Sequence, residues 1–287
     1  MKKYNLITAS LLTLGLTACG AQNTSTTNES TTAQVTSAPG APGTEPFWAY
    51  AGKTGIGTSY EQYQNGQYSD SAATGDVSKV WFSIAKGMIT ETMFGLIHQA
   101  QIKDMQFIVT GKDFTVSEAD DLDVTIDYLH KDAQGRPLSL AYKVTSTDKQ
   151  GRFSLEKHIF TDPDGQTLFV RSVFNTELEG LKAYVSVNPY INNNGLGDFA
   201  KTTEQGLVAW EDDNYLSLQS ATSFKDKTVG FTGESDGINA LKTTQSINTQ
   251  YTNTGDTAGN VSMLAELGDI SANTTFDLAL SFGKTQQ

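Results

Sequence analysis

The segment LDVTIDY at residues 122–128 carries the clearest fold signal in this sequence. Apolar side chains at Leu122, Val124, Ile126 and Tyr128 alternate with polar ones at the intervening positions. A period of two places successive side chains on opposite faces of an extended strand, so that one face packs and the other meets water. This arrangement is typical of antiparallel sheets.

The same alternation returns at three further places along the chain. The repeats are Leu138-Leu140-Tyr142-Val144, Leu181-Ala183-Val185-Val187 and Phe276-Leu278-Leu280-Phe282. Helical periodicity is scarce, and Val261–Leu267 is the one short candidate helix. About 240–250 residues follow the N-terminal region, which is within the range that an all-β sandwich occupies as one domain. We therefore predict an all-β fold built from two large packed sheets.

Turns separate the predicted strands at regular intervals. Asp132–Gly135, Asp148–Gly151 and Asp162–Gly165 each place Asp first and Gly fourth. An Asp side chain opens a turn by bonding nearby backbone N–H groups, and Gly supplies the unusual φ that closes it. Turns at this spacing predict a meander of hairpins through residues 121–187.

The first 37 residues predict export and a lipid anchor. Lys2 and Lys3 precede an apolar stretch, 6–16, that is too short to span a bilayer, so residues 1–18 are interpreted as a signal peptide. Small residues directly before Cys19, the only cysteine, resemble the lipobox of bacterial lipoproteins, in which cleavage leaves an acylated N-terminal cysteine. The alternative is an ordinary secretory peptide with an incidental Cys19. Residues 20–37 are rich in Ser, Thr, Asn and Gln, and we expect a flexible tether.

This reading locates the protein at the cell envelope, on the outer membrane if the cell is Gram-negative. The net charge of −12 and the pI near 4.6 argue against a nucleic-acid partner, because phosphates repel an acidic surface. A neutral polysaccharide fits this charge, although the charge does not select one.

The acidic residues do not form a recognisable catalytic pair. A glycosidase needs two carboxylates flanking a pocket. Asp120, Asp121, Asp123 and Asp127 fall on the polar side of an alternating strand, where a solvated face is the simpler interpretation. The group Glu211–Asp213 is interpreted as a turn between strands. We therefore expect no catalytic residue in this chain.

Metal and cofactor motifs are incomplete. Asp162-x-Asp164-Gly165 resembles the start of a calcium loop but lacks the later Glu. The histidines His98, His130 and His158 have no zinc-binding spacing. Gly55-x-Gly57 lacks the rest of a dinucleotide fingerprint, and neither a nucleophile elbow nor a phosphate-binding loop is present. The sequence thus predicts neither a metal nor a cofactor.

Three tryptophans are candidates for contact with sugar rings. Trp48, Trp81 and Trp210 each have a flat apolar face that stacks on a sugar, but tryptophans in a large sandwich more often lie in the core or at an interface. Trp81, within 78–84, is expected in a strand core. The sugar-binding residues stay unassigned at this point.

Eight segments form an ordered series along the chain. They are Ala38–Gly43, Lys53–Thr58, Ser78–Phe82, Gly87–Glu91, Asp104–Val109, Lys157–Pro163, Tyr184–Asn194 and Leu278–Gly283. This series resembles the N-terminal domain of bacterial glucoamylases and glucodextranases, of the glycoside hydrolase family fifteen type. The similarity runs from about residue 38 to about 284, within an expected domain 38–287, and departs from the pattern at Gly95.

The resemblance implies a large antiparallel super-β-sandwich of the galactose-mutarotase-like type. In the family this sandwich packs against an (α/α)₆ barrel that carries the two catalytic glutamates. No segment here matches the barrel motifs, so no catalytic residue transfers.

The leading hypothesis is a non-catalytic N-terminal domain of a lipid-anchored α-glucan hydrolase, which stabilises and docks a catalytic barrel absent from this chain. One alternative is a stand-alone carbohydrate-binding lipoprotein at the cell surface that contacts α-glucan. Another is a separate subunit that docks onto a barrel encoded elsewhere.

Overall fold

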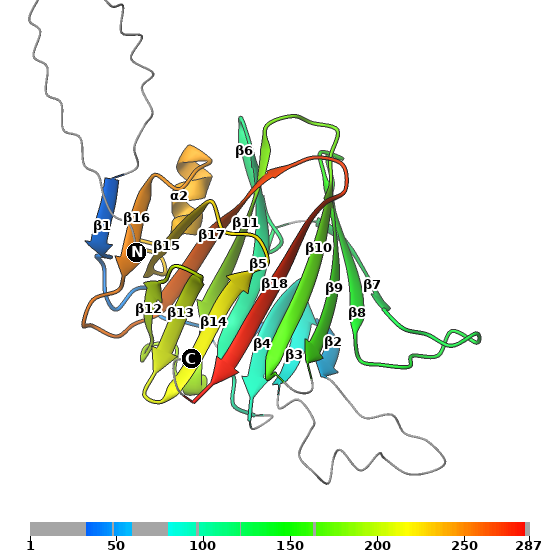
Figure 1. The fold of residues 1–287 in the computed structure, drawn as a ribbon, viewed down its shortest axis with the longest axis horizontal. Coiled ribbons are helices and arrows are strands. Elements are labelled where there is room, and N and C mark those ends of the chain that lie inside the picture. Colours follow the sequence, from blue (N-terminus) through cyan, green and yellow to red (C-terminus); the bar gives the residue numbers. More distant parts are fainter. Residues whose placement is uncertain are drawn as a thin grey trace, which may run out of the picture. The chain divides into compact units, whose positions relative to one another are not determined.

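The computed structural model describes residues 33–47, 49–58, 80–95, 98–120, 122–162 and 165–284. These residues belong to the unit Thr32–Gln287, in which two large sheets face each other across a shared core (Figure 1). The predicted all-β sandwich is confirmed. The expected signal peptide, Cys19 and residues 20–32 of the expected tether lie outside the described residues, as does Trp48.

One sheet has ten strands. In spatial order these are β1 (Ala33–Ser37), β16 (Thr249–Asn253), β12 (Phe199–Thr202), β13 (Gly206–Glu211), β14 (Asn214–Ser220), β18 (Thr274–Gly283), β10 (Thr167–Asn175), β9 (Ser154–Asp162), β8 (Tyr142–Asp148) and β7 (Leu122–Tyr128). Among the named strand pairs, β1–β16 is parallel and the others are antiparallel. β1 is formed by residues 33–37, at the end of the stretch expected to be a tether.

The other sheet has eight strands. Its order is β15 (Asp226–Phe231), β17 (Val261–Ile270), β11 (Leu181–Pro189), β5 (Ile102–Gly111), β4 (Met88–Phe94), β3 (Val80–Ala85) and β2 (Lys53–Thr58), and β6 (Phe114–Ser117) also pairs with β5. The short 3₁₀ helix η1 (Ile191–Asn193) follows β11, and the helix α2 (Gly237–Thr244) follows β15.

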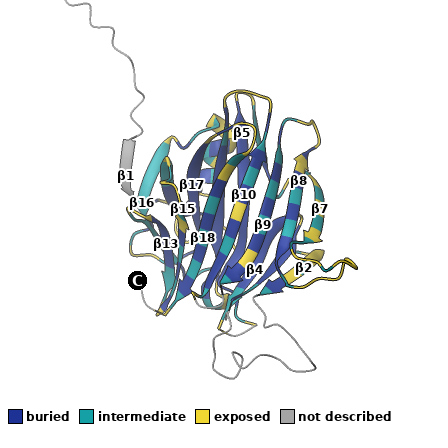
Figure 2. Ribbon diagram, turned by 45° about the vertical axis from the view of Figure 1, so that its right-hand side comes forward, coloured by how far each residue is buried: buried dark blue, intermediate teal, exposed yellow. Residues whose placement is uncertain are grey.

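The core lies between the sheets and consists of apolar side chains from both. Phe107 of β5 meets Phe174 of β10 edge to face, with ring centroids 5.8 Å apart, and Phe94 of β4 stacks on Phe282 of β18 at 5.8 Å. Along β8, β9 and β10 buried and solvent-facing positions alternate, as Figure 2 shows. The outer face of this sheet is therefore open along these strands.

The eight-stranded sheet is instead covered on both faces around β5, β11 and β17. Leu241 of α2 and the following Ile247 pack onto Tyr184, Ile108 and Leu264, on the side away from the main core. A strand covered on both faces can carry an apolar run without alternation, as β17 does, whereas β11 keeps the alternation predicted at Leu181–Val187. The expectation of a helix at Val261–Leu267 was wrong for this reason, because the segment is part of β17.

The hairpin between β7 and β8 corrects a second prediction. The alternating run from Leu138 to Val144 predicted one strand, but β8 begins only at Tyr142, and the Leu138 side chain is 57% exposed. Pro137 lacks the N–H group that a continuous ladder requires. The turn at Asp132 forms as predicted, with the Gly135 N–H donating to the Asp132 carbonyl.

A buried ion pair joins the two sheets. Lys157 of β9 points into the core with no exposed surface, and its ammonium group bonds the Glu118 carboxylate and the Gly87 carbonyl. Glu118 also accepts hydrogen bonds from the Ser146 hydroxyl and, at 2.9 Å, from the Phe107 N–H. Because burial disfavours the charged form, the pKa of Lys157 is lowered, and the Glu118 charge opposes that shift.

Candidate functional site

The outer face of the ten-stranded sheet is open, and side chains from neighbouring strands form rows across it. Arg171 of β10 lies opposite His158 of β9 on one side and Asp277 of β18 on the other. The guanidinium donates two hydrogen bonds to Asp277, at 2.8 and 2.9 Å. This bidentate pair holds the pKa of Asp277 below its ordinary value.

His158 and its neighbours extend this charged row. A His158 ring nitrogen lies 2.8 Å from the Glu156 carboxylate, and Lys143 of β8 lies 3.6 Å from the other Glu156 oxygen. The hydrogen bond from His158 is the largest cause of the lowered pKa of Glu156. Every charge in this row therefore has a partner of opposite or complementary character.

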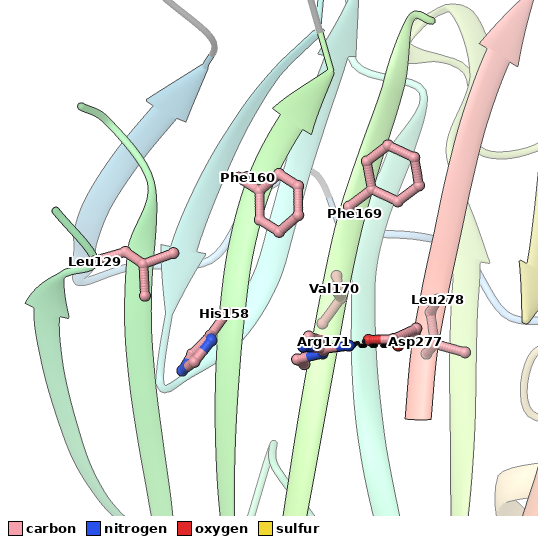
Figure 3. A pocket seen from close by; sticks show the side chains of 8 residues that line it. All are labelled: Leu129, His158, Phe160, Phe169, Val170, Arg171, Asp277 and Leu278. Carbon is pink, nitrogen blue, oxygen red and sulfur yellow. Dashed lines mark hydrogen bonds and ion pairs between the residues drawn. The ribbon is translucent and has the colours of Figure 1, made fainter. Parts of the chain in front are cut away.

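Two phenylalanines form a second row beside the charged one. Phe169 of β10 is directly opposite Phe160 of β9, with ring centroids 5.7 Å apart and planes inclined by 31°. Phe160 is 40% exposed. Together with His158, Arg171 and Asp277, the two rings line a shallow groove of about 370 Å³ (Figure 3), with Leu129 at one side.

A longer aromatic row crosses β12, β13 and β14. Phe199, Trp210 and Tyr215 lie opposite one another in register, with centroid separations of 5.6 and 6.4 Å and nearly parallel rings. All three rings are half-buried on the open face. Trp210 therefore lies on the open face of the sheet and not in the core between the sheets.

Carboxylates and carboxamides meet at the end of these strands. Asp198 has no exposed surface and accepts the Ile191 N–H, and Glu211 accepts a 2.6 Å hydrogen bond from Asn194. Burial raises the pKa of Asp198 well above 3.8, with a further contribution from the Glu211 charge. Burial is also the main cause of the raised pKa of Glu211.

Sequence reasoning interpreted Glu211–Asp213 as a turn; Asp212 and Asp213 form that turn, but Glu211 is the last residue of β13, and the cluster was missed. The signal was the run of three asparagines at 192–194, because Asn192 and Asn193 adopt φ of 57° and 59°, which asparagine tolerates better than most residues. A fully buried Asp198 has no route to a polymer in solvent. The pair therefore lacks the open pocket between two acids that glycoside hydrolysis requires.

A second acidic cluster fastens the segment before β2 to the eight-stranded sheet. The Tyr50 hydroxyl donates to Asp104 at 2.7 Å, and the Tyr50 N–H donates to Glu91 at 3.0 Å. Lys53 pairs with Glu91, and Lys103 lies 3.5 Å from Asp104. A lysine lies beside each carboxylate. The cluster therefore holds Tyr50 against the sheet and is not arranged for proton transfer.

The other residues considered as candidates from the sequence do not come together at one site. Asp123 and Asp127 are exposed, as expected of a solvated face, and Asp127 pairs with Lys131. Asp121, Pro163 and Asp164 lie outside the described residues. His98, His130 and His158 lie on separate elements, and in the described part of the chain no three His, Cys, Asp or Glu side chains form a group that could hold a metal. None of the described helices is long and apolar enough to cross a membrane.

Comparison with known proteins decides the family. Residues 38–287 match the family model for glucodextranase, domain N. The chain belongs to this family. The resemblance seen in the ordered sequence segments is therefore confirmed.

Relatives of this glucodextranase N domain are glucoamylases. A glucoamylase from Clostridium sp. (strain G0005) is 34% identical over 260 residues, which cover 87% of this chain and 33% of that protein. The crystal structure of a bacterial glucoamylase complexed with acarbose matches with a TM-score of 0.75 and 30% identity, over 88% of this chain and 35% of the other. This chain spans about a third of the length of the relatives it matches.

Proposed function

We propose that this domain stabilises and docks the catalytic domain of an α-glucan hydrolase and does not cleave glucan itself. The supporting observation is that the relatives are glucoamylases about three times as long, and this chain matches one third of each. The chemistry of three described acids agrees, because Asp198 has no exposed surface and Glu91 and Asp104 each lie beside a lysine.

A domain replacement tests this proposal. The segment of the Clostridium glucoamylase that this chain matches is exchanged for residues 33–287, and a second variant has that segment deleted. We expect the chimera to release glucose from maltooligosaccharides and the deletion to lose activity or to aggregate. Equal activity and thermal stability in both proteins would show that the domain is dispensable.

The same proposal predicts that the 287-residue chain alone releases no glucose. Incubation with maltoheptaose, followed by chromatography of the products, measures this directly. Glucose release at an enzymatic rate from the isolated chain, absent from a mock preparation, would contradict a purely auxiliary role.

Cys19 supports a further part of the proposal, namely that the protein is exported and held at the cell envelope by a lipid. Acyl chains supply about 0.8 kcal/mol of membrane affinity per buried CH₂ group. Intact-mass measurement and detergent phase partition of the native protein and of Cys19→Ser test this. An N-terminal acylated cysteine is expected in the native protein only, and a chain that keeps residues 1–18 without acylation would refute the anchor.

A further inference from the structure

The groove on the outer face of the ten-stranded sheet combines exposed aromatic rings with planar polar groups. Phe160 and Phe169 lie two positions along their strands from His158 and Arg171, which corresponds to a separation of about 7 Å. Ala279 of β18 lies opposite Phe169, so no large side chain from that strand covers the Phe169 ring. The groove therefore has an apolar side and a hydrogen-bonding side.

Its charges do not favour an ionic ligand. Arg171 is neutralised by Asp277 through two hydrogen bonds, and His158 and Lys143 share Glu156. A bound anion or cation would compete with these pairs, whereas hydroxyl groups can add hydrogen bonds to atoms already held in place. The net charge of −12 also repels anionic polymers.

A protein partner fits this groove less well. Burying it under another domain would remove the Arg171–Asp277 pair from water, and the cost of desolvating such a pair can exceed the attraction between its charges. A small polyhydroxylated ring is able to stack on phenylalanine while the ion pairs stay hydrated at its edge.

We propose that this groove binds a neutral oligosaccharide, with a sugar ring against Phe160 and Phe169 and its hydroxyl groups toward His158, Arg171 and Asp277. The groove would hold a glucan chain on the sandwich while a docked catalytic domain acts on another part of that chain.

Calorimetric titration of the 287-residue chain with maltoheptaose and with isomaltoheptaose tests the proposal. We expect saturable binding of at least one of these, and a loss of affinity of about tenfold in each of Phe160→Ala and Phe169→Ala. Leu178→Ala, which removes a 46%-exposed side chain outside the groove, is the matched control and should bind as the native chain does. Circular dichroism melts establish that each variant is folded.

Several results would overturn the proposal. They are the absence of heat with both oligosaccharides, unchanged affinity in both phenylalanine variants, loss of binding in Trp210→Ala alone, and equal affinity for an oligogalacturonate. In a fifth, Phe160→Ala weakens the packing between the two domains of the glucoamylase chimera. That result would assign the groove to protein docking. The chimera's activity with an intact groove is measured separately, so the auxiliary function and the sugar site fail independently.

Discussion

At the scale of single residues, the pair Lys157–Glu118 is sensitive to substitution, because both side chains are buried between the sheets. Removing one partner of a buried ion pair leaves the other charge unpaired, at a typical cost of about 3–5 kcal/mol. We expect Lys157→Met to lower the free energy of unfolding by about that amount in urea denaturation at pH 7.

Lys143→Met is the matched control, because Lys143 makes a partly exposed pair with Glu156 on the adjacent strand. Exposed pairs contribute about 0–1 kcal/mol. The double variant Lys157→Met/Glu118→Gln should recover part of the loss, since it leaves neither charge of this pair unpaired. If Lys157→Met proved as mild as Lys143→Met, the pair would not be buried as described.

Asp198 gives a prediction about pH. Its pKa is raised in the folded protein, so the folded state holds a proton that the unfolded chain releases, and stability falls as pH rises from about 3.8 toward the folded pKa. Asp198→Asn removes this titration. We expect the variant's advantage in free energy of unfolding to be absent near pH 3.5, to grow as pH rises through that range and to level off above it. Urea unfolding of both proteins from pH 3.5 to pH 8 measures the difference, and a difference independent of pH would exclude a titrating Asp198.

At the scale of strands, alternation predicts a strand wherever every second side chain is polar, even where both faces are covered, as in β11. β7 and β18 were predicted from alternation, because each has one face in water. β17 has both faces covered, so its apolar run Val261–Leu267 has no period of two and was taken for a helix. The start of β8 was misplaced because alternation continues through Leu138, where Pro137 interrupts the ladder. Local pattern cannot report which distant element covers a face.

Two phenylalanines on adjacent strands test this division into faces. Phe174 of β10 is fully buried against Phe107 and Phe276, and Phe160 of β9 is 40% exposed. We expect Phe174→Ala to cost about 3–5 kcal/mol through cavity formation. Phe160→Ala should cost under about 1 kcal/mol, as surface substitutions do. Chemical denaturation measures both, and similar losses would mean that the two side chains occupy equivalent environments.

At the scale of the whole molecule, the family and the two-sheet fold could be predicted from sequence because ordered segments spanned most of the chain. The candidate site could not be predicted from the sequence. The groove unites Phe160, Phe169 and Asp277, which lie up to 117 positions apart and meet only through the register of β9, β10 and β18. Asp198 and Glu211 likewise meet through the β12–β13 pairing, and their spacing in the sequence does not predict this contact.

Docking to a catalytic domain makes a prediction for the domain as a unit. A partner that binds only the folded state stabilises it, and a covalently joined partner is present at a high effective concentration. Peptides from this domain should therefore exchange amide hydrogens more slowly in the glucoamylase chimera than in the isolated chain. Hydrogen–deuterium exchange with mass spectrometry measures this, peptide by peptide.

Protection from exchange should be greatest over the strands and loops that contact the catalytic domain. The groove around Phe160 and Phe169 should exchange alike in both proteins, because it is left free for sugar. Equal exchange at every peptide would mean that the two domains fold side by side without stabilising each other.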